Sequence, residues 1–264
     1  MDTQVKAFWD RRAQDPSNND SEVTHRDIWQ RWLEIETLKR YLHSEDRLLD
    51  VGCGAGYTTR LLAPLVREAV GVDYSESMIE RARASAGQKT LTFEVSDVMS
   101  LQPGTPRTSG PPGTSLGVFD VAVSSRCLIN LAGWPEQQHA LRNIAGMLKP
   151  GGRFLFLEGL ADGRDGLNRM RVASGLEPMP KVWHNVDFVE EQLRAFLEPL
   201  FIIRERRHFG VYDFVARIVH PLLVAPDAPQ YEARINEIGA RLALDSQGHG
   251  EISRVVFLVL ERRA

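Results

Sequence analysis

Three glycines and two carboxylates in the first third of the chain have the types and spacing of a nucleotide-binding turn. Gly52, Gly54 and Gly56 alternate after an apolar run, and Asp50 precedes the first of them by two positions. Glycines let the backbone turn sharply and approach a ligand, and a following helix offers its amide-rich N-terminus to an anion. Asp73 ends the next apolar run about twenty residues later, where a carboxylate can accept two ribose hydroxyls. The pattern predicts a ligand with a ribose.

The spacing of the glycines argues against a dinucleotide. The dinucleotide pattern is Gly-x-Gly-x-x-Gly, in which the third glycine packs the helix on the strand. This chain instead has Gly-x-Gly-x-Gly. NAD, which carries a pyrophosphate, is therefore the less natural ligand.

The segment from Asp50 to Gly56 resembles the first motif of class I S-adenosylmethionine-dependent methyltransferases, and Asp73 matches their ribose-binding acidic residue. Later segments extend the resemblance. Residues 93–98 resemble the strand end that contacts adenine, residues 119–124 the fourth strand, and residues 148–153 the turn into the fifth strand. The resemblance spans roughly residues 45 to 160. It implies S-adenosyl-L-methionine as the cofactor and a Rossmann-like methyltransferase fold.

The resemblance also implies a binding role for particular residues. The backbone of residues 52–56 with Asp50 would hold the methionyl end, Asp73 the ribose, and Asp97 with Val98 the adenine edge. The expected cofactor-binding residues are Asp50, Gly52, Cys53, Gly54, Gly56, Asp73, Tyr74, Met78, Asp97, Val98 and Ser125.

Two side chains after the fourth strand are candidates for the catalytic site. Methyl transfer from a sulfonium is an in-line displacement, so the protein must hold the donor and the acceptor colinear. Arg126 and Asn130 occupy the place where related enzymes face both the methyl group and the acceptor. Alternatively, Arg126 pairs with a surface carboxylate and Asn130 caps a turn. The chain has no Asn-Pro-Pro-Tyr type of motif at this place, which disfavours nucleobase and glutamine acceptors.

His184, beside Trp183, is the preferred general base for a hydroxyl acceptor. The pKa of an imidazole lies near neutral pH, where an enzyme of this kind works, and the Trp183 indole can form an apolar wall beside it. A structural or exposed histidine is the alternative, and His208 and His220 are rival bases. No spacing of His and Cys suggests a metal site.

We expect the substrate to contact residues of two insertions late in the chain: Arg169, Trp183, His184 and Tyr212. Arginines are frequent in both insertions, and paired guanidinium groups suit a carboxylate or phosphate on the substrate. Neutralisation of these arginines by nearby acidic residues is the alternative.

The surrounding pattern predicts the elements that position these residues. Between residues 47 and 158, segments typical of strands alternate with amphipathic helices, which indicates a doubly wound, mostly parallel α/β sheet. Strands at 201–206 and 255–261 bring the expected total to seven. We expect an N-terminal helical segment or lid at residues 1–46 and a cofactor-binding core at 47–158. A first cap insertion with a helix should follow at 159–200, and the last two strands should lie within 201–264, separated by a second cap insertion at 208–254. The Phe8–Trp9 pair reads as core packing or as part of a mobile lid.

Bulk properties limit the classes of function. The 264 residues have a net charge of −3 and a pI near 6.2, which disfavours nucleic-acid binding as the main function. The two cysteines lie in no paired motif, which favours reduced thiols and a cytoplasmic location. No apolar run is long enough to cross a membrane. We expect a monomer or a homodimer.

These observations together predict a methyltransferase that acts on a small molecule, with O-methylation of a hydroxylated, possibly sugar-linked or acidic metabolite favoured over N- or C-methylation. An RNA or protein methyltransferase would show a contiguous basic track beside the pocket. A non-catalytic, cofactor-binding partner subunit is the alternative from another class.

Overall fold

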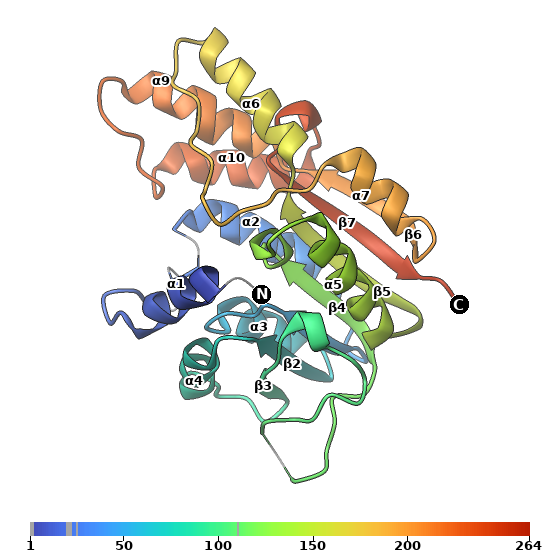
Figure 1. Cartoon of the computed structure of the whole chain (residues 1–264). Coiled ribbons are helices and arrows are strands. Elements are labelled where there is room, and N and C mark those ends of the chain that lie inside the picture. The colour runs from blue at the N-terminus through green and yellow to red at the C-terminus, as the bar shows by residue number, and fades with distance from the viewer. Residues whose placement is uncertain (1–2, 20–22, 25, 110) are drawn as a thin grey trace.

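A seven-stranded sheet forms the centre of the molecule, with strand order β3-β2-β1-β4-β5-β7-β6 (Figure 1). The computed structural model describes residues 3–19, 23–24, 26–109 and 111–264. The strands are β1 (Arg47–Val51), β2 (Glu68–Asp73), β3 (Leu91–Val95), β4 (Phe119–Ser125), β5 (Leu148–Gly159), β6 (Phe201–His208) and β7 (Val255–Arg262). The first five pair in parallel, and β7 pairs antiparallel with β5 and β6. The predicted fold class is therefore confirmed.

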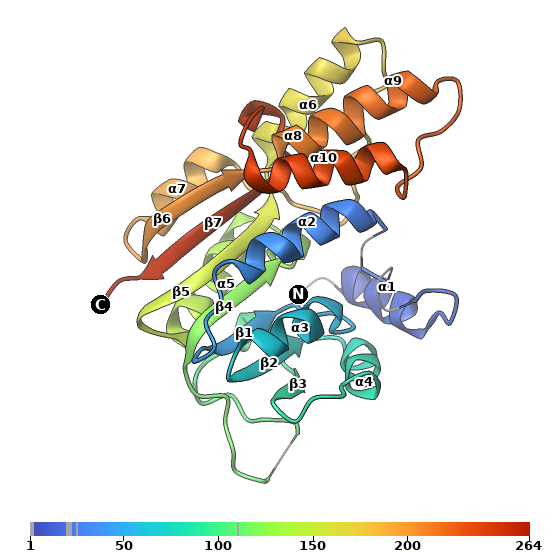
Figure 2. The ribbon, with the colours of Figure 1, turned by 180° about the vertical axis from the view of Figure 1, so that it is seen from behind.

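Helices cover both faces of this sheet (Figures 1 and 2). The helices are α1 (Thr3–Gln14), α2 (Ile28–Lys39), α3 (Tyr57–Leu62), α4 (Glu76–Ala84), α5 (Trp134–Met147), α6 (Ala161–Ala173), α7 (Glu190–Leu197), α8 (Gly210–Phe214), a π-helical turn (Val215–Val219), α9 (His220–Val224) and α10 (Arg234–Asp245). Helices α5 and α7 pack on one face, and α2, α3, α4, α8 and α10 pack on the other. Leu48 and Leu49, adjacent in β1, are both fully buried, as expected for a strand covered on two faces.

Gly163 and Gly166 allow close packing between α6, after β5, and the backbone that leads into β7. The Gly/Asp/Arg-rich stretch after β5 forms the first turns of α6, and Gly163 and Gly166 face the chain just before β7. A Cβ on Gly163 would lie 1.7 Å from the Ser253 carbonyl oxygen, and one on Gly166 would lie 2.0 Å from that of Glu251. Because only glycine permits this approach, these two residues let α6 pack closely on the backbone that leads into β7.

None of the helices in the described ranges is both long and apolar enough to cross a bilayer.

Candidate active site

The turn after β1 needs its glycines. Gly52, Gly54 and Gly56 have φ angles of 73°, 53° and 75°, a region that side chains other than glycine rarely adopt. The backbone amides of Gly52 and Cys53 donate to the Val72 carbonyl at 2.8 and 3.0 Å, so the turn folds over the end of β2. Gly56 is the N-cap residue of α3. The loop presents backbone to the space above the sheet, as the spacing predicted.

Two buried carboxylates brace this turn. Asp73 accepts the Gly54 amide at Oδ2 and the Ser75 amide at Oδ1, both at 2.9 Å. Asp50 accepts the Thr59 hydroxyl at 2.6 Å. Burial raises the pKa of each carboxyl to about 6, so both are mainly ionised above neutral pH. Asp73 therefore offers a negative charge at the end of β2, where a ribose is expected.

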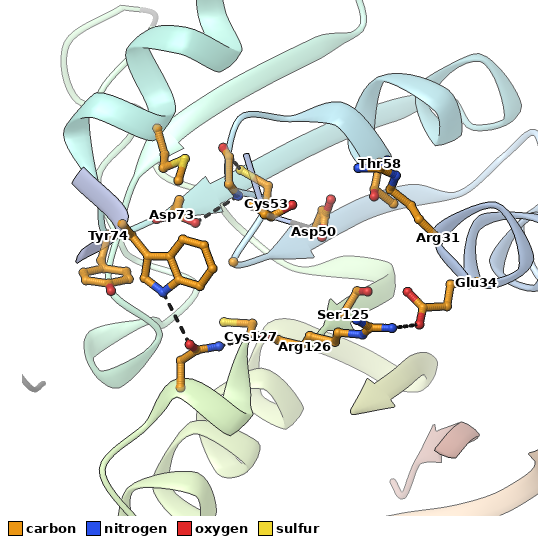
Figure 3. A pocket seen from close by; sticks show the side chains of 16 residues that line it. Arg31, Glu34, Asp50, Cys53, Thr58, Asp73, Tyr74, Ser125, Arg126 and Cys127 are labelled. Carbon is orange, nitrogen blue, oxygen red and sulfur yellow. Dashed lines mark hydrogen bonds and ion pairs between the residues drawn. The ribbon is translucent and has the colours of Figure 1, made fainter. Parts of the chain in front are cut away.

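A cavity lies over the carboxyl ends of β1, β2 and β4 (Figure 3). Eight of the residues expected to bind the cofactor line it: Asp50, Gly52, Cys53, Gly54, Asp73, Tyr74, Met78 and Ser125. The Tyr74 hydroxyl is buried and, within the described part of the chain, has no hydrogen-bond partner. A buried polar atom without a partner costs free energy, so this wall suits a ligand with polar groups. The cavity thus fits the cofactor implied by the glycine turn. We call it the cofactor cavity.

The other three residues expected at the cofactor lie outside the wall of this cavity. A Cβ on Gly56 would meet the Phe93 ring at 2.5 Å, so this glycine serves the packing of α3 on the sheet. Asp97 caps the 3₁₀ turn Val98–Ser100 by accepting the Met99 amide at 2.9 Å. Val98 is buried in the core.

Asn130 joins three separate parts of the chain at the edge of the cofactor cavity. Its Nδ2 donates to the Arg126 carbonyl at 2.8 Å, which fixes the orientation of the amide. Its Oδ1 lies 3.3 Å from Trp9 Nε1 and 2.7 Å from His184 Nδ1. An amide oxygen only accepts hydrogen bonds, so Nδ1 of His184 carries the proton. In the neutral ring, Nε2 therefore keeps its lone pair, the state that a general base requires.

Aromatic rings surround His184. The ring centroids of Phe8, Trp9 and Trp183 lie 4.9, 5.4 and 5.1 Å from that of the imidazole. Burial lowers the pKa of His184 below its ordinary value, so the ring is neutral at pH 7. Phe8 and Trp9 come from α1, and His184 comes from the segment between α6 and α7. The N-terminal helix thus meets the first insertion directly over the carboxyl ends of the strands.

Arg126 has a strained backbone and a buried ionic partner. Its φ is 55°, which is uncommon for a residue with a side chain. Its guanidinium pairs with Glu34, which is 4% exposed on α2 and also lines the cofactor cavity (Figure 3). Burial raises the pKa of Glu34, while Arg126 opposes that shift. Backbone strain of this kind concentrates at functional sites, where the surroundings enforce it.

Glu158, which the motif analysis did not single out, holds the backbone that carries Arg126 and Asn130. Its Oε1 accepts the amides of Cys127 and Leu128, both at 3.1 Å, and its Oε2 accepts the Ile129 amide at 3.3 Å. Ser124 also donates its hydroxyl to this carboxylate. The fully buried Glu158 at the end of β5 therefore sets the position of the turn after β4.

The pH dependence of stability should report this buried carboxylate. Burial raises the pKa of Glu158 from 4.5 to about 7, so the folded state binds its proton more tightly than the unfolded state. The resulting stabilisation is complete at low pH and is lost as the pH rises through about 7. Relative to Glu158→Gln, the wild type should lose roughly 1–3 kcal/mol of unfolding free energy between about pH 5 and pH 8. Urea denaturation at both pH values measures this, and a pH-independent difference would contradict it.

The remaining residues expected at the substrate lie in different places. Trp183 is 59% exposed beside Phe8, at a ring distance of 5.8 Å. Arg169 is exposed on α6. Tyr212 is fully buried and donates its hydroxyl to Asp27 at 2.6 Å. The structure brings none of these three into the wall of the cofactor cavity.

Several residues that line the cofactor cavity were not expected there: Thr24, Arg31, Glu34, Thr58 and Cys127. Trp9, which had been considered as part of a lid, also lines it. Arg31 and Glu34 lie three positions apart and so share one face of α2. That spacing is the signal that could have identified them.

A second cavity adjoins the first and shares Arg126 with it. Residues of the first insertion and of the start of β7 contribute its wall, among them Arg164, Asn185, Asp187 and Arg254. Arg164 pairs with Asp187, and Arg254 Nη2 lies 2.6 Å from Asp213. The Oδ1 atom of Asn185 is buried and accepts no hydrogen bond from the described residues. We call this space the acceptor cavity.

Within the described residues, no group of three or more His, Cys, Asp or Glu side chains is placed to hold a metal ion.

Comparison with known proteins places residues 48–152 in the family described as "Methyltransferase domain". An uncharacterized methyltransferase, YcgJ of Bacillus subtilis, is 32% identical over 115 residues, which cover 44% of this chain and 41% of that protein. The ubiquinone biosynthesis O-methyltransferase of Coxiella burnetii is 32% identical over 111 residues, covering 41% and 42%. The chain therefore spans less than half the length of the curated relatives it matches.

Among solved structures, the N-methyltransferase NodS of Bradyrhizobium japonicum, in complex with S-adenosylhomocysteine, superposes with a TM-score of 0.58. The match covers 98% of both chains at 18% sequence identity, and it therefore concerns the fold.

Proposed function

We propose that this chain, which belongs to the class I S-adenosylmethionine-dependent methyltransferases, transfers a methyl group to a hydroxyl of a small, uncharged acceptor. The hydrogen bond between Asn130 and His184 carries the proposal. It leaves the lone pair on Nε2 of His184 and ties this ring to Asn130 in the wall of the cofactor cavity, while the next residue, Asn185, lines the second cavity, in which we place the acceptor. A hydroxyl needs such a base, whereas an amine can react by positioning alone.

The chemistry divides between the cofactor and the protein. S-adenosyl-L-methionine supplies an electrophilic methyl group when bound. Asp73 accepts hydrogen bonds from the ribose hydroxyls, and the glycine turn holds the methionyl end. His184 accepts the proton of the acceptor hydroxyl at Nε2, while Asn130 retains the proton on Nδ1. Trp9 and Phe8 shield the imidazole from water, which lowers its pKa and keeps it neutral, with the lone pair on Nε2 available.

The charges around the acceptor cavity favour a neutral acceptor over an acidic one. Arg126, Arg164 and Arg254 each have a carboxylate partner: Glu34, Asp187 and Asp213. An acidic substrate would have to compete with these carboxylates. A hydroxyl can donate to the buried Oδ1 of Asn185 and accept from a guanidinium N–H at the same time. The mixture of donors and acceptors therefore suits a sugar-like, polyhydroxylated group.

Paired acceptors test this proposal. Neutral polyhydroxylated compounds should yield S-adenosylhomocysteine, and their carboxylated or deoxygenated counterparts should react at least about tenfold more slowly, as expected when a buried polar group loses its partner. Asn185→Leu should remove this preference, whereas Lys181→Leu, an exposed substitution in the same segment, should not. Faster turnover of amines, RNA or protein would instead support the corresponding alternative. Cofactor binding without turnover of any acceptor would support a non-catalytic partner subunit.

A further inference from the structure

A third cavity, of about 360 Å³, lies between α6, α8–α9 and the segment that leads into α10. It shares no lining residue with the cofactor cavity. These helices gather at the end of the molecule opposite α4 (Figure 2). The methyl transfer proposed above makes no use of this space.

Hydrogen bonds from one buried amide hold the wall of this cavity in place. Asn236, which is 1% exposed on α10, donates from Nδ2 to the carbonyl oxygens of Gln230 and Tyr231, at 3.0 and 3.1 Å. Its Oδ1 lies 3.1 Å from Nδ1 of the buried His220. One amide therefore ties the segment before α10 to α9, and it fixes Tyr231 and His220 around the opening.

Arg171 brings a positive charge without a counter-charge to this wall. Its Nε donates to the Glu177 carbonyl at 2.8 Å, and its Nη1 donates to the Arg217 carbonyl. No carboxylate among the residues that the structure describes lies within ion-pair distance of it. Burial and the neighbouring Arg217 and Arg254 lower the pKa of this guanidinium. A half-buried cation in such surroundings gains stability from an anion.

Arg217 supplies a second guanidinium. It pairs with the buried Asp27, and its Cζ lies 5.5 Å from the centre of the Tyr231 ring. Its Nε is buried, and within the described ranges no acceptor reaches it. Asp227 is the acidic side chain in the wall, and it is exposed to solvent. Among the residues described, the wall thus has two guanidinium groups, those of Arg171 and Arg217, against the single carboxylate of Asp227.

We propose that this cavity binds a small anion with a carboxylate or phosphate group, held by Arg171 and Arg217 and closed over by Tyr231. The planar fork of a guanidinium matches the two oxygens of such a group. The bound anion supplies the counter-charge that Arg171 lacks, and it links the two insertions through α6 and the turn at residues 215–219. The site does not depend on the chemistry at the cofactor cavity.

Thermal unfolding with inorganic phosphate, and separately with acetate, tests the site. With chloride added to equalise ionic strength, saturating anion should raise the melting temperature by about 3 °C. Arg171→Gln should remove the rise, and Arg234→Gln, at a guanidinium that is 74% exposed outside the cavity, should retain it. A rise with phosphate alone identifies a phosphate site, and a rise with acetate alone identifies a carboxylate site.

Two further measurements keep the test decisive. Unchanged affinity of Arg171→Gln for S-adenosylhomocysteine would show that the variant is folded. Should that variant fail to fold, Tyr231→Ala takes its place: it removes the ring that closes over the anion and should weaken binding of the anion, followed by ³¹P line broadening of phosphate. Equal melting temperatures in phosphate, acetate and chloride would overturn the proposal. So would an undiminished rise in Arg171→Gln.

Discussion

His184→Ala is expected to lower kcat for a hydroxyl acceptor by roughly 10²- to 10⁴-fold, the usual cost of losing a general base. The affinity for S-adenosylhomocysteine should stay nearly constant, because His184 is not in the wall of the cofactor cavity. Since burial lowers the pKa of His184, the acidic limb of the wild-type rate profile should lie below about pH 6.5. That limb should disappear in the variant.

Steady-state kinetics with calorimetry on the same preparations measures both quantities. His43→Ala is the matched control, because His43 is exposed and precedes β1, whereas the cofactor cavity lies over the carboxyl ends of the strands. Unchanged turnover in His184→Ala would reject the base and leave a mechanism of positioning alone. The rival His208 ends β6, and His220 faces the third cavity. Like His184, neither lines the cofactor cavity, but His184 alone of the three has a hydrogen bond to Asn130 in its wall among the described residues.

Gly54→Val is expected to prevent cofactor binding while leaving most of the fold intact. The φ of Gly54 is 53°, where a β-branched residue is strongly disfavoured, and its amide donates to Asp73. An added Cβ would also lie 2.9 Å from a methyl carbon of Thr24. The side chain therefore disturbs the turn, its carboxylate partner and the cavity wall together.

Calorimetric titration of Gly54→Val with S-adenosylhomocysteine should give no measurable heat of binding. Gly104→Val is the control, because Gly104 has open space around its Cβ position and an ordinary φ. Near-native affinity in a folded Gly54→Val protein would mean that the turn is structural and that the ligand binds elsewhere.

Features with a local cause could be predicted from the sequence. Alternating glycines need positive φ, and Asp73 follows a strand, so the turn and its carboxylate were both readable as a motif. The periodicity of apolar residues likewise predicted which strands and helices follow one another along the chain. The ends of elements were less predictable: the pattern predicts a helix over residues 57–66, but α3 stops at Leu62, before a 3₁₀ turn that contains Pro64.

Features that depend on contacts between distant segments were not readable in the same way. Glu34 looks like a polar residue on the outer side of an amphipathic helix, yet it meets Arg126 from 92 positions away. The hydrogen bond between Trp9 and Asn130 spans 121 positions. Among the arginines of the insertions, Arg164 and Arg206 pair with Asp187 and Glu190, as the alternative of neutralisation by nearby acidic residues had it. Arg217 instead pairs with Asp27, which only the fold brings near. Arg171, on which the third cavity depends, has no carboxylate partner among the residues that the structure describes.

The central claim is that the cofactor cavity holds S-adenosylmethionine against Asp73. Calorimetric titration of the wild type and Asp73→Ala with S-adenosylhomocysteine, and of the wild type with NAD, tests it most directly. The account predicts saturable binding of S-adenosylhomocysteine to the wild type, weaker binding of NAD, and a loss of roughly 1.5–3 kcal/mol in Asp73→Ala, as expected for hydrogen bonds to a charged group. Tighter binding of NAD, or unchanged affinity in a folded Asp73→Ala protein, would contradict it.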